Sequence, residues 1–183
     1  DIAMMRALPN VTVVAPGDLV EAACATKAIY ETPGTCYLRL GRGGEKQIHD
    51  SIDNFEIGKA IKIQDGEKIA IFSTGAIFDE VDEACKVLSK EGIVPAVYTF
   101  PTVKPIDKEV ILECASQYNT IITVEEHNLS GGFGSAVAEV LAEQDSKKAK
   151  LVRIALDDRY SCIVGSQKYL RQQSSGDYFI YDE

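Results

Sequence analysis

The stretch that decides the fold is TIITVEEHNLSGGFGSAVAEVLAE, residues 120–143. Its start, Thr120 to Val124, is a β-branched run of the kind found in buried strands. Glycines then interrupt the pattern, and from Gly132 to Glu143 apolar residues recur at helical spacing. A strand, a glycine turn and an amphipathic helix in this order predict one step of an α/β fold. The apolar face of the helix consists of Ala136, Val137, Val140 and Leu141.

The alternation of strand and helix continues on both sides of this stretch. A helix is expected from Pro105 to Tyr118, begun by Asp107, because an aspartate side chain caps free backbone N–H groups. Another is expected from residue 77 to residue 88, with Gly92 ending it. The remaining elements of this block are strands at 94–100 and 151–156 and a short closing helix at 166–173.

Two strands near the start of the block define its edge. They cover Ile57 to Ile63 and Lys68 to Phe72, and the Asp65-Gly66 step between them favours a tight hairpin. The sequence therefore predicts that these two strands pair antiparallel. The whole block is predicted to be α/β, with a mostly parallel sheet, helices on both faces and one antiparallel edge strand.

The first forty residues predict a smaller α/β unit. Val11 to Ala15 and Thr35 to Leu40 are expected to be strands, and Asp18 with Glu21 forms a capping box that starts the helix between them. A β-α-β unit of this kind is parallel and right-handed. Residues 1–8 already follow a helical pattern, so we expect that further chain precedes them.

Three segments follow from these patterns. Residues 1–42 are interpreted as the end of a partial α/β domain, because about 50 residues are too few for a stable core alone. Residues 43–54 are polar, glycine-rich and without periodicity, which is typical of a linker. Residues 55–183 are interpreted as one complete domain.

Composition narrows the classes of partner. The 183 residues carry a net charge of −9, which disfavours nucleic acids and anionic membranes, since both attract clustered Lys and Arg. No apolar run reaches the ~20 residues that cross a bilayer, and no secretory signal is evident. The five cysteines lack paired spacing, so we expect reduced thiols in a cytoplasmic protein.

One loop has the chemistry of an anion site. Arg39 and Arg42 leave a strand end on the glycine-rich run Gly41-Arg42-Gly43-Gly44. Guanidinium groups and exposed backbone N–H groups together suit a phosphate or a carboxylate. The alternative is a solvated linker whose arginines pair with surface acids. The Gly-Lys-Ser/Thr of a P-loop is absent.

A second candidate lies within residues 120–143. Glu125, Glu126 and His127 stand between the strand and the helix, where two carboxylates and an imidazole could serve acid–base chemistry. The alternative, which we favour, is structural: the acids accept hydrogen bonds from backbone amides and His127 lies at an interface. His127 and His49 are far apart without metal-ligand spacing, so no metal site is predicted.

Several segments resemble the transketolase family. Residues 1–10 and 13–18 resemble the middle of its pyrimidine-binding domain, and residues 37–44 resemble the strand and loop that close that domain. Segments at 101–107, 124–141 and 165–171 resemble parts of the transketolase C-terminal domain. Together they are most similar to small bacterial transketolase C-terminal sections. Deoxyxylulose-phosphate synthases and the β subunits of 2-oxoacid dehydrogenases are more distant relatives with the same architecture.

The resemblance implies a chemistry and a partner. In the family, thiamine diphosphate with Mg²⁺ supports transfer of a two-carbon ketol unit between sugar phosphates. The residues that hold the cofactor and activate it lie outside this sequence, so no catalytic, cofactor-binding or metal residue is assigned, and the chain alone is expected to be inactive. The implied partner is an N-terminal transketolase section, on the same polypeptide or a separate subunit, in a homodimer or heterotetramer.

The resemblance also gives roles to particular side chains. Arg39 or Arg42 resembles the family arginine that holds the substrate phosphate, and the choice between them stays open. Arg6 resembles an arginine used in this way by deoxyxylulose-phosphate synthases. Glu125, Glu126 and His127 are implied to be interface or supporting residues, because the family's C-terminal domain packs and dimerises. One alternative is a non-catalytic interaction or regulatory module with the same fold. Another is a subunit of the deoxyxylulose-phosphate synthase or 2-oxoacid dehydrogenase β type.

Overall fold

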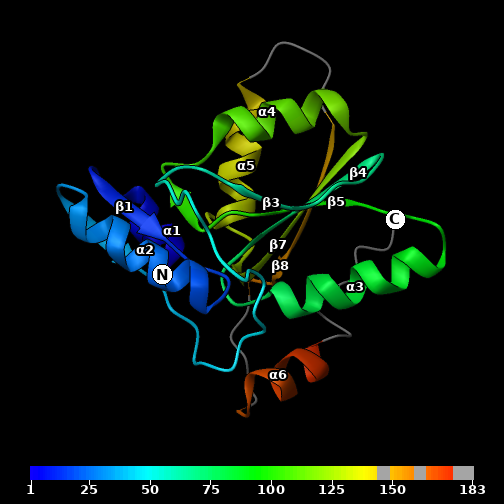
Figure 1. Ribbon diagram of the computed structural model, residues 1–183, viewed down its shortest axis with the longest axis horizontal. Helices are drawn as coiled ribbons and strands as arrows, with labels where there is room; N and C mark the ends of the chain where they lie inside the picture. The colour runs from blue at the N-terminus through cyan, green and yellow to red at the C-terminus, as the bar shows by residue number, and fades with distance from the viewer. Residues whose placement is uncertain (144–148, 159–163, 175–183) are drawn as a thin grey trace.

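The computed structural model describes residues 1–143, 149–158 and 164–174, and its strands form two sheets (Figure 1). The smaller sheet has the order β2-β1-β6. Within it β1 (Val11–Val14) pairs parallel with β2 (Thr35–Leu38), as predicted, and α2 (Leu19–Glu31) connects them. Helix α1 (Ile2–Ala7) lies against β1.

The larger sheet has the order β3-β5-β4-β7-β8. Strands β5, β4, β7 and β8 run parallel to one another, and β3 at one edge runs antiparallel to β5. This confirms the predicted sheet type. The strands are β3 (Ile61–Gln64), β4 (Ile69–Thr74), β5 (Ala96–Thr99), β7 (Thr120–Asn128) and β8 (Lys150–Leu156).

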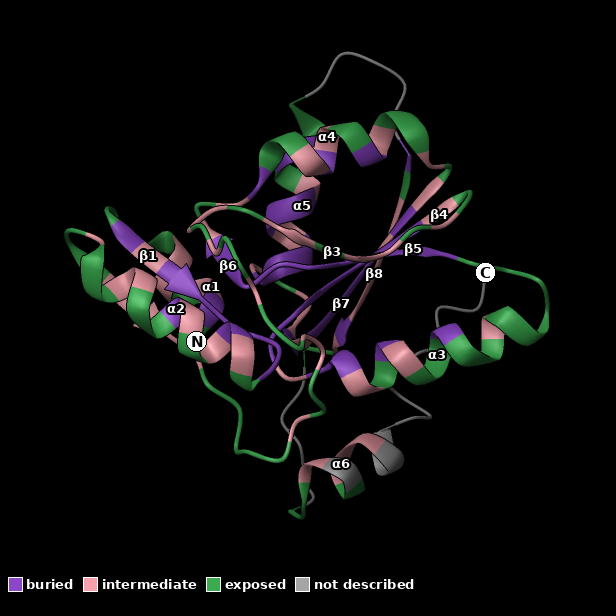
Figure 2. Ribbon diagram, viewed as in Figure 1, coloured by how far each residue is buried: buried purple, intermediate pink, exposed green. Residues whose placement is uncertain are grey.

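Helices cover both faces of the larger sheet, as predicted. In Figure 1, α4 (Lys108–Gln117) and α5 (Phe133–Ala142) lie on one face and α3 (Phe78–Lys90) on the other. Successive strand residues point to opposite faces, so Phe72 belongs to the core cluster under α4 and α5, whereas Ile71 belongs to the cluster under α3. The strands are accordingly buried between helices whose outer faces are exposed (Figure 2).

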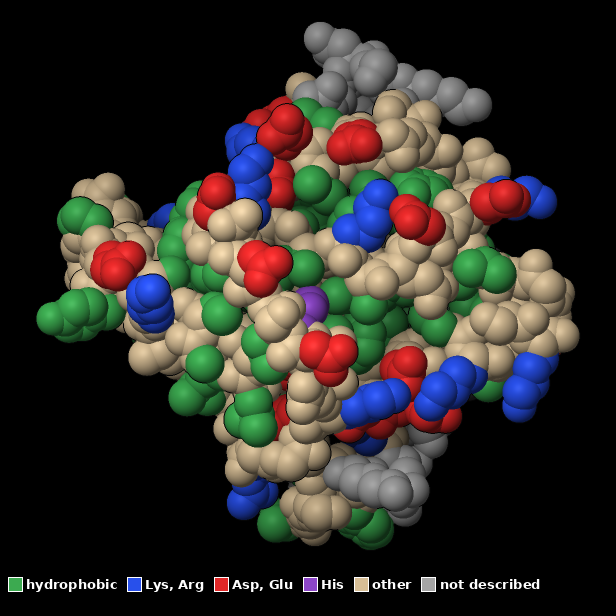
Figure 3. Space-filling view, in the orientation of Figure 1, with side chains coloured by type: hydrophobic (Ala, Val, Ile, Leu, Met, Phe, Trp, Pro, Cys, Tyr) green, Lys and Arg blue, Asp and Glu red, His purple; other side chains and the backbone are tan. Residues whose placement is uncertain are grey.

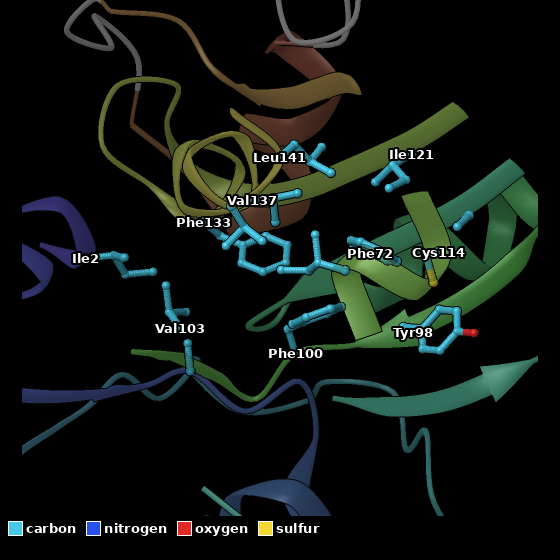
Figure 4. Close-up of a cluster of buried hydrophobic side chains, with 14 of the residues drawn as sticks. Ile2, Phe72, Tyr98, Phe100, Val103, Cys114, Ile121, Phe133, Val137 and Leu141 are labelled. Atoms are coloured by element: carbon cyan, nitrogen blue, oxygen red, sulfur yellow. The ribbon is translucent and has the colours of Figure 1, made fainter. Parts of the chain in front are cut away.

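The two sheets share one hydrophobic core. Figure 4 shows Ile2 of α1 and Val103 beside Phe100 and Phe133, and all four side chains are buried. The rings of Phe100 and Phe133 are 5.1 Å apart between centroids. The smaller unit therefore completes its core against the larger one, which agrees with its being too short to bury a core alone.

The predicted hairpin of β3 with β4 is wrong, because β3 pairs with β5 and β4 lies between β5 and β7. The segment that follows β3 crosses the start of β5 instead of folding back. A Cβ on Gly66 would lie 2.1 Å from the backbone of Pro95 and Ala96, and Glu67 N donates to Val94 O at 2.9 Å. The apolar, buried residues of β4 favour a central position in the sheet over an edge.

A short strand that the sequence did not predict joins the two parts of the chain. Strand β6 (Thr102–Lys104) pairs antiparallel with β1, so residues from either side of the segment 43–54 form one sheet. The division into residues 1–42, 43–54 and 55–183 stays a prediction. Strand β7 is also longer than expected, because pairing with β4 and β8 continues beyond Val124, so Glu125 to Asn128 lie on a strand.

The remaining features concern surface and thiols. Cys24, Cys36, Cys85 and Cys114 are free, and Cys162 lies outside the described residues. No helix in the described ranges is long and apolar enough to cross a bilayer. On the face in Figure 3, basic and acidic side chains are interspersed. The final described helix is α6 (Gln167–Ser174), close to the predicted position.

Candidate anion-binding site

A pocket of about 430 Å³ opens where the carboxyl ends of strands from both sheets meet. Backbone hydrogen bonds fix this junction, because Gly75 after β4 donates to Ala15 after β1 at 2.9 Å. Ligands gather at such strand ends in open α/β sheets. The pocket is lined by Asp1, Tyr37, Leu38, Arg39, Leu40, Gly41, Arg42, Ala76, Glu126 and Gln167.

Arg39 is held in place by protein groups on two sides. Its Nε donates to Asp1 Oδ2 at 2.8 Å, and its Nη2 donates to the backbone oxygen of Glu126 at 3.0 Å. The Tyr37 hydroxyl reaches the same Asp1 oxygen at 3.0 Å. Gly75 lies beside Arg39 Nη1 and has a φ of 71°, an angle that favours glycine. Arg39 is therefore pre-oriented at the pocket, with part of its guanidinium already engaged.

Arg42 differs from Arg39 because it is exposed and makes no hydrogen bond or ion pair with any residue that the structure describes. It stands on a loop in which Gly43 and Gly44 have φ values of 94° and 90°. Only glycine adopts such angles without strain, so the two positions that follow Arg42 carry no side chain. An anion that enters the pocket would meet one fixed guanidinium and one free guanidinium.

The acids in the pocket are already neutralised. Asp1 is paired with Arg39, and Glu126 accepts from Arg171 Nη2 of α6 at 3.1 Å and from Gln167. Arg171 also donates to Ala76 O at 2.6 Å. The positive charge of Arg42 is thus the uncompensated charge among the described lining residues, which favours an anionic ligand.

The structure does not bring Arg6 into this pocket. Its Nη1 donates to Gly131 O at 2.6 Å and to Gly132 O at 3.2 Å, and its Nη2 pairs with Glu139 at 2.6 Å. These contacts tie α1 to the glycine turn before α5. Arg6 remains a predicted phosphate ligand from resemblance, but its guanidinium is occupied by the protein.

Glu125 faces the start of α5 and not the pocket. Its Oε2 accepts from Phe133 N and its Oε1 from Gly134 N, both at 2.6 Å. A Cβ on Gly132 would lie 2.2 Å from Oε2, so this glycine makes room for the carboxylate. Burial raises the pKa of Glu125 to about 7, and the two amide hydrogen bonds oppose that rise. The arrangement is a buried helix cap.

His127 joins α1 to β7. It is buried, its Nδ1–H donates to Asn128 O at 2.8 Å, and its Nε2 accepts from Ala3 N at 3.3 Å. Burial lowers the pKa of His127 below its ordinary value. A neutral imidazole that serves one donor and one acceptor fits these two partners.

Sequence reasoning missed a buried cluster beside the pocket. Asp18, Glu21 and His49 bring one ligand atom each within 4.8 Å of one another, as the one metal-competent group of three among the described residues. Thr99 of β5 also contacts Glu21. The capping box was visible in the sequence, but nothing in the spacing indicates that His49, 28 residues later than Glu21, folds onto it.

Comparisons with known proteins agree with this fold. The family model "Transketolase, C-terminal domain" matches residues 58–168. A "Putative transketolase C-terminal section" from Methanocaldococcus jannaschii is 38% identical over 86% of this chain and 49% of its own length. A 1-deoxy-D-xylulose-5-phosphate synthase from Halothermothrix orenii is 34% identical over 87% of this chain and 26% of its own.

A solved structure agrees as well. The structure described as "Split gene transketolase, inactive beta4 tetramer" superposes with a TM-score of 0.84 at 33% identity, over 94% of this chain and 55% of that chain. The chain spans about half the length or less of the curated relatives described above. The chain therefore belongs to the transketolase C-terminal domain family.

Proposed function

We propose that this chain is the C-terminal section of a thiamine-diphosphate-dependent transferase that moves a two-carbon ketol unit between sugar phosphates. Its part in that reaction is to hold the substrate phosphate. The observation that carries the proposal is the pair of Arg39, fixed by Asp1 and Glu126, and Arg42, which has no partner among the described residues, in one open pocket.

The chemistry of the pocket supports a phosphate. Guanidinium groups bind phosphate oxygens through charge-assisted hydrogen bonds, and a fixed Arg39 loses little freedom when it does so. The glycines at 43 and 44 leave the approach to Arg42 open, since nothing lies within 4 Å of a Cβ built on either. Arg42 is the stronger candidate of the two for direct binding, and Arg39 for orientation.

The described residues do not fit a complete site for the cofactor and its metal. The carboxylate oxygens of Asp18 and Glu21 all accept hydrogen bonds from protein donors, so the metal-competent group has no free oxygen ligand. The cofactor and Mg²⁺ are therefore assigned to an N-terminal section, on the same polypeptide or on a separate subunit. The active assembly is a homodimer or heterotetramer in the cytoplasm.

Anion titration tests the pocket directly. Sulfate or inorganic phosphate added to the purified chain is expected to bind, measured by calorimetry or by amide resonances of residues 38–44. Arg42→Ala is expected to weaken binding by about tenfold or more, since a charged hydrogen bond is lost. Lys27→Ala, which removes one exposed charge from α2 away from the pocket, is the matched control. Equal weakening by both variants would contradict a specific site.

Cofactor titration tests whether the cofactor is bound by a separate N-terminal section. Thiamine diphosphate with Mg²⁺ is expected to give no binding heat with this chain alone, and ketol transfer is expected only after an N-terminal transketolase section is added. Tight binding of the cofactor by this chain alone would show that the assignment to a separate section is wrong. Absence of activity with a matching N-terminal section would favour a non-catalytic module.

A second candidate is a deoxyxylulose-phosphate synthase type of subunit, favoured by the 34% identical relative of that name. Both candidates handle a phosphorylated sugar, so the arginine pocket does not separate them. Formation of 1-deoxy-D-xylulose 5-phosphate by the assembled enzyme, in place of ketol transfer between sugar phosphates, would favour this alternative. A 2-oxoacid dehydrogenase β subunit remains the third alternative of this architecture.

A further inference from the structure

A buried network holds the segment between β2 and β3 against the start of α2. Glu21, in the first turn of α2, is 0% exposed, and its Oε1 is 2.8 Å from His49 Nε2 and 2.6 Å from the Thr99 hydroxyl. Its other oxygen accepts from Gly17 N at 2.6 Å. The residues Asp18, Glu21, His49 and Thr99 are called the clasp below.

Asp18 completes the clasp from the N-cap of α2. Its Oδ1 accepts from Glu21 N at 2.7 Å, and its Oδ2 accepts from Ile48 N at 2.7 Å and from His49 N at 3.0 Å. Every carboxylate oxygen of the clasp therefore has a protein donor. This arrangement fits a charge network better than a cation site, since a metal would have to displace these donors.

The charges of the clasp favour a proton on His49. Two buried carboxylates face one imidazole, and burying them without a compensating cation is costly. The hydrogen bond from Glu21 raises the pKa of His49, and the charges of Glu21 and Asp18 add to the rise, while burial opposes it. Strand β5 contributes the neutral hydroxyl of Thr99 to the same carboxylate.

The clasp also ends the loop that carries Arg42. The chain leaves β2 at Leu38 and is fixed again at Ile48 and His49. Arg39 is held by Asp1 and Glu126 at the start of this stretch. Beyond it, Gly41, Gly43 and Gly44 bear no side chains, and among the described residues the ion pair to another element is the exposed one of Lys46 with Asp82 of α3. The position of Arg42 therefore depends on the two points at which its loop is fixed, and one of these points is the clasp.

We propose that His49 is a positioning residue for the anion pocket, whose imidazolium closes the clasp and so holds the Arg42 loop in its binding position. This inference rests on the proposed role of the pocket. His49 does not touch the anion. It acts through Asp18, Glu21 and the loop backbone, so loss of its proton loosens the loop and weakens anion binding without removing any ligand group.

The experiment measures sulfate affinity against pH, because sulfate keeps both charges over the whole range in which a histidine titrates. Wild-type affinity is expected to fall as pH rises, with a midpoint equal to the pKa read from the His49 imidazole resonances. This measurement needs no variant. A sulfate affinity that stays constant over the pH range in which His49 titrates would overturn the inference.

Two variants sharpen the result. His49→Gln keeps a donor to Glu21 but no charge, and is expected to weaken sulfate binding about fivefold or more at low pH and to flatten the profile. Amides of residues 41–45 are expected to exchange faster in this variant. Asp50→Asn, the exposed neighbour in the same segment, is the control and is expected to keep the wild-type profile.

The outcomes separate this inference from the proposed function. If the wild-type chain binds sulfate and His49→Gln binds it equally well with the same profile, the inference is wrong and the pocket stands. If the wild-type chain binds no sulfate, the pocket itself is wrong and the inference fails with it. Zn²⁺ alone is expected to leave the His49 resonances unmoved, and tight Zn²⁺ binding at His49 would overturn the clasp.

Discussion

Arg39 Nη2 donates to the backbone carbonyl of Glu126 at 3.0 Å, a contact between residues 87 positions apart in the chain. It joins the end of β2 in the smaller sheet to the end of β7 in the larger one. The Glu126 side chain meanwhile binds Arg171 of α6. One residue of β7 thus connects the candidate phosphate site to the closing helix.

This contact separates the two arginines experimentally. Arg39→Ala is expected to lower the free energy of unfolding by ~1–3 kcal/mol, because it removes the charged donor that Asp1 and the Glu126 carbonyl share. Arg42→Ala is expected to change it by less than ~0.5 kcal/mol, since the exposed Arg42 lacks a partner in the described part of the chain. Urea denaturation measures both, and equal losses would contradict the division into a fixed and a free arginine.

Glu126 is expected to hold α6 in place. Glu126→Ala removes the carboxylate that binds Arg171 and Gln167, so backbone amides of residues 167–171 are expected to exchange faster and a protease to cut there sooner. The control is Glu80→Ala, because Glu80 is farther from Arg171, at 3.6 Å, and more exposed. Exchange that is unchanged in the Glu126 variant would show that other contacts dock the helix.

The buried carboxyl of Glu125 predicts a pH dependence of stability. Its pKa is raised from 4.5 in the unfolded chain to about 7 in the folded one, so the folded state binds more protons between these values. The contribution of this carboxyl to the free energy of unfolding is therefore fully present below the unfolded pKa and is lost as pH rises through about 7. Glu125→Gln is expected to remove this slope in urea denaturation series, and a slope that survives the substitution would assign it to other groups.

The crossing at Gly66 is expected to be intolerant of a side chain. Gly66→Ala would place a Cβ 2.1 Å from the backbone of Pro95 and Ala96, and is expected to cost about 3 kcal/mol or more of stability. Gly92→Ala, whose Cβ would meet open space at a φ of 77°, is the control and is expected to cost about 1 kcal/mol. Similar melting temperatures for the two variants would contradict the tight crossing.

Much of the secondary structure follows from local patterns. The β-branched run at Thr120 and the helix from Phe133 were expected because burial on a strand or a helix face imposes its own spacing. Asp107 begins α4 by accepting from Val110 N at 3.2 Å, and Asp18 begins α2 by accepting from Glu21 N at 2.7 Å. Caps of this kind involve residues three apart, so sequence alone reveals them.

The candidate anion loop was predicted in the same way, but its surroundings were not. Arginines beside glycines can be read from Arg39 to Gly44, whereas the partners that distinguish Arg39 from Arg42 come from Asp1 and Glu126. The His49 contact with Glu21 was invisible for the same reason. Side chains that meet across many residues leave no periodic signal.

The sequence by itself determined the α/β class, the order of most elements and the arginine loop, because hydrophobic spacing and capping are local. Only the tertiary structure decided that β3 pairs with β5, that β6 joins the sheet of β1, and that Glu125 caps α5. Strand neighbours are chosen by which apolar faces pack together, and that choice depends on the whole chain. The same packing leaves Arg42 without a partner among the described residues and places the half-buried His49 beside the carboxylates of Asp18 and Glu21.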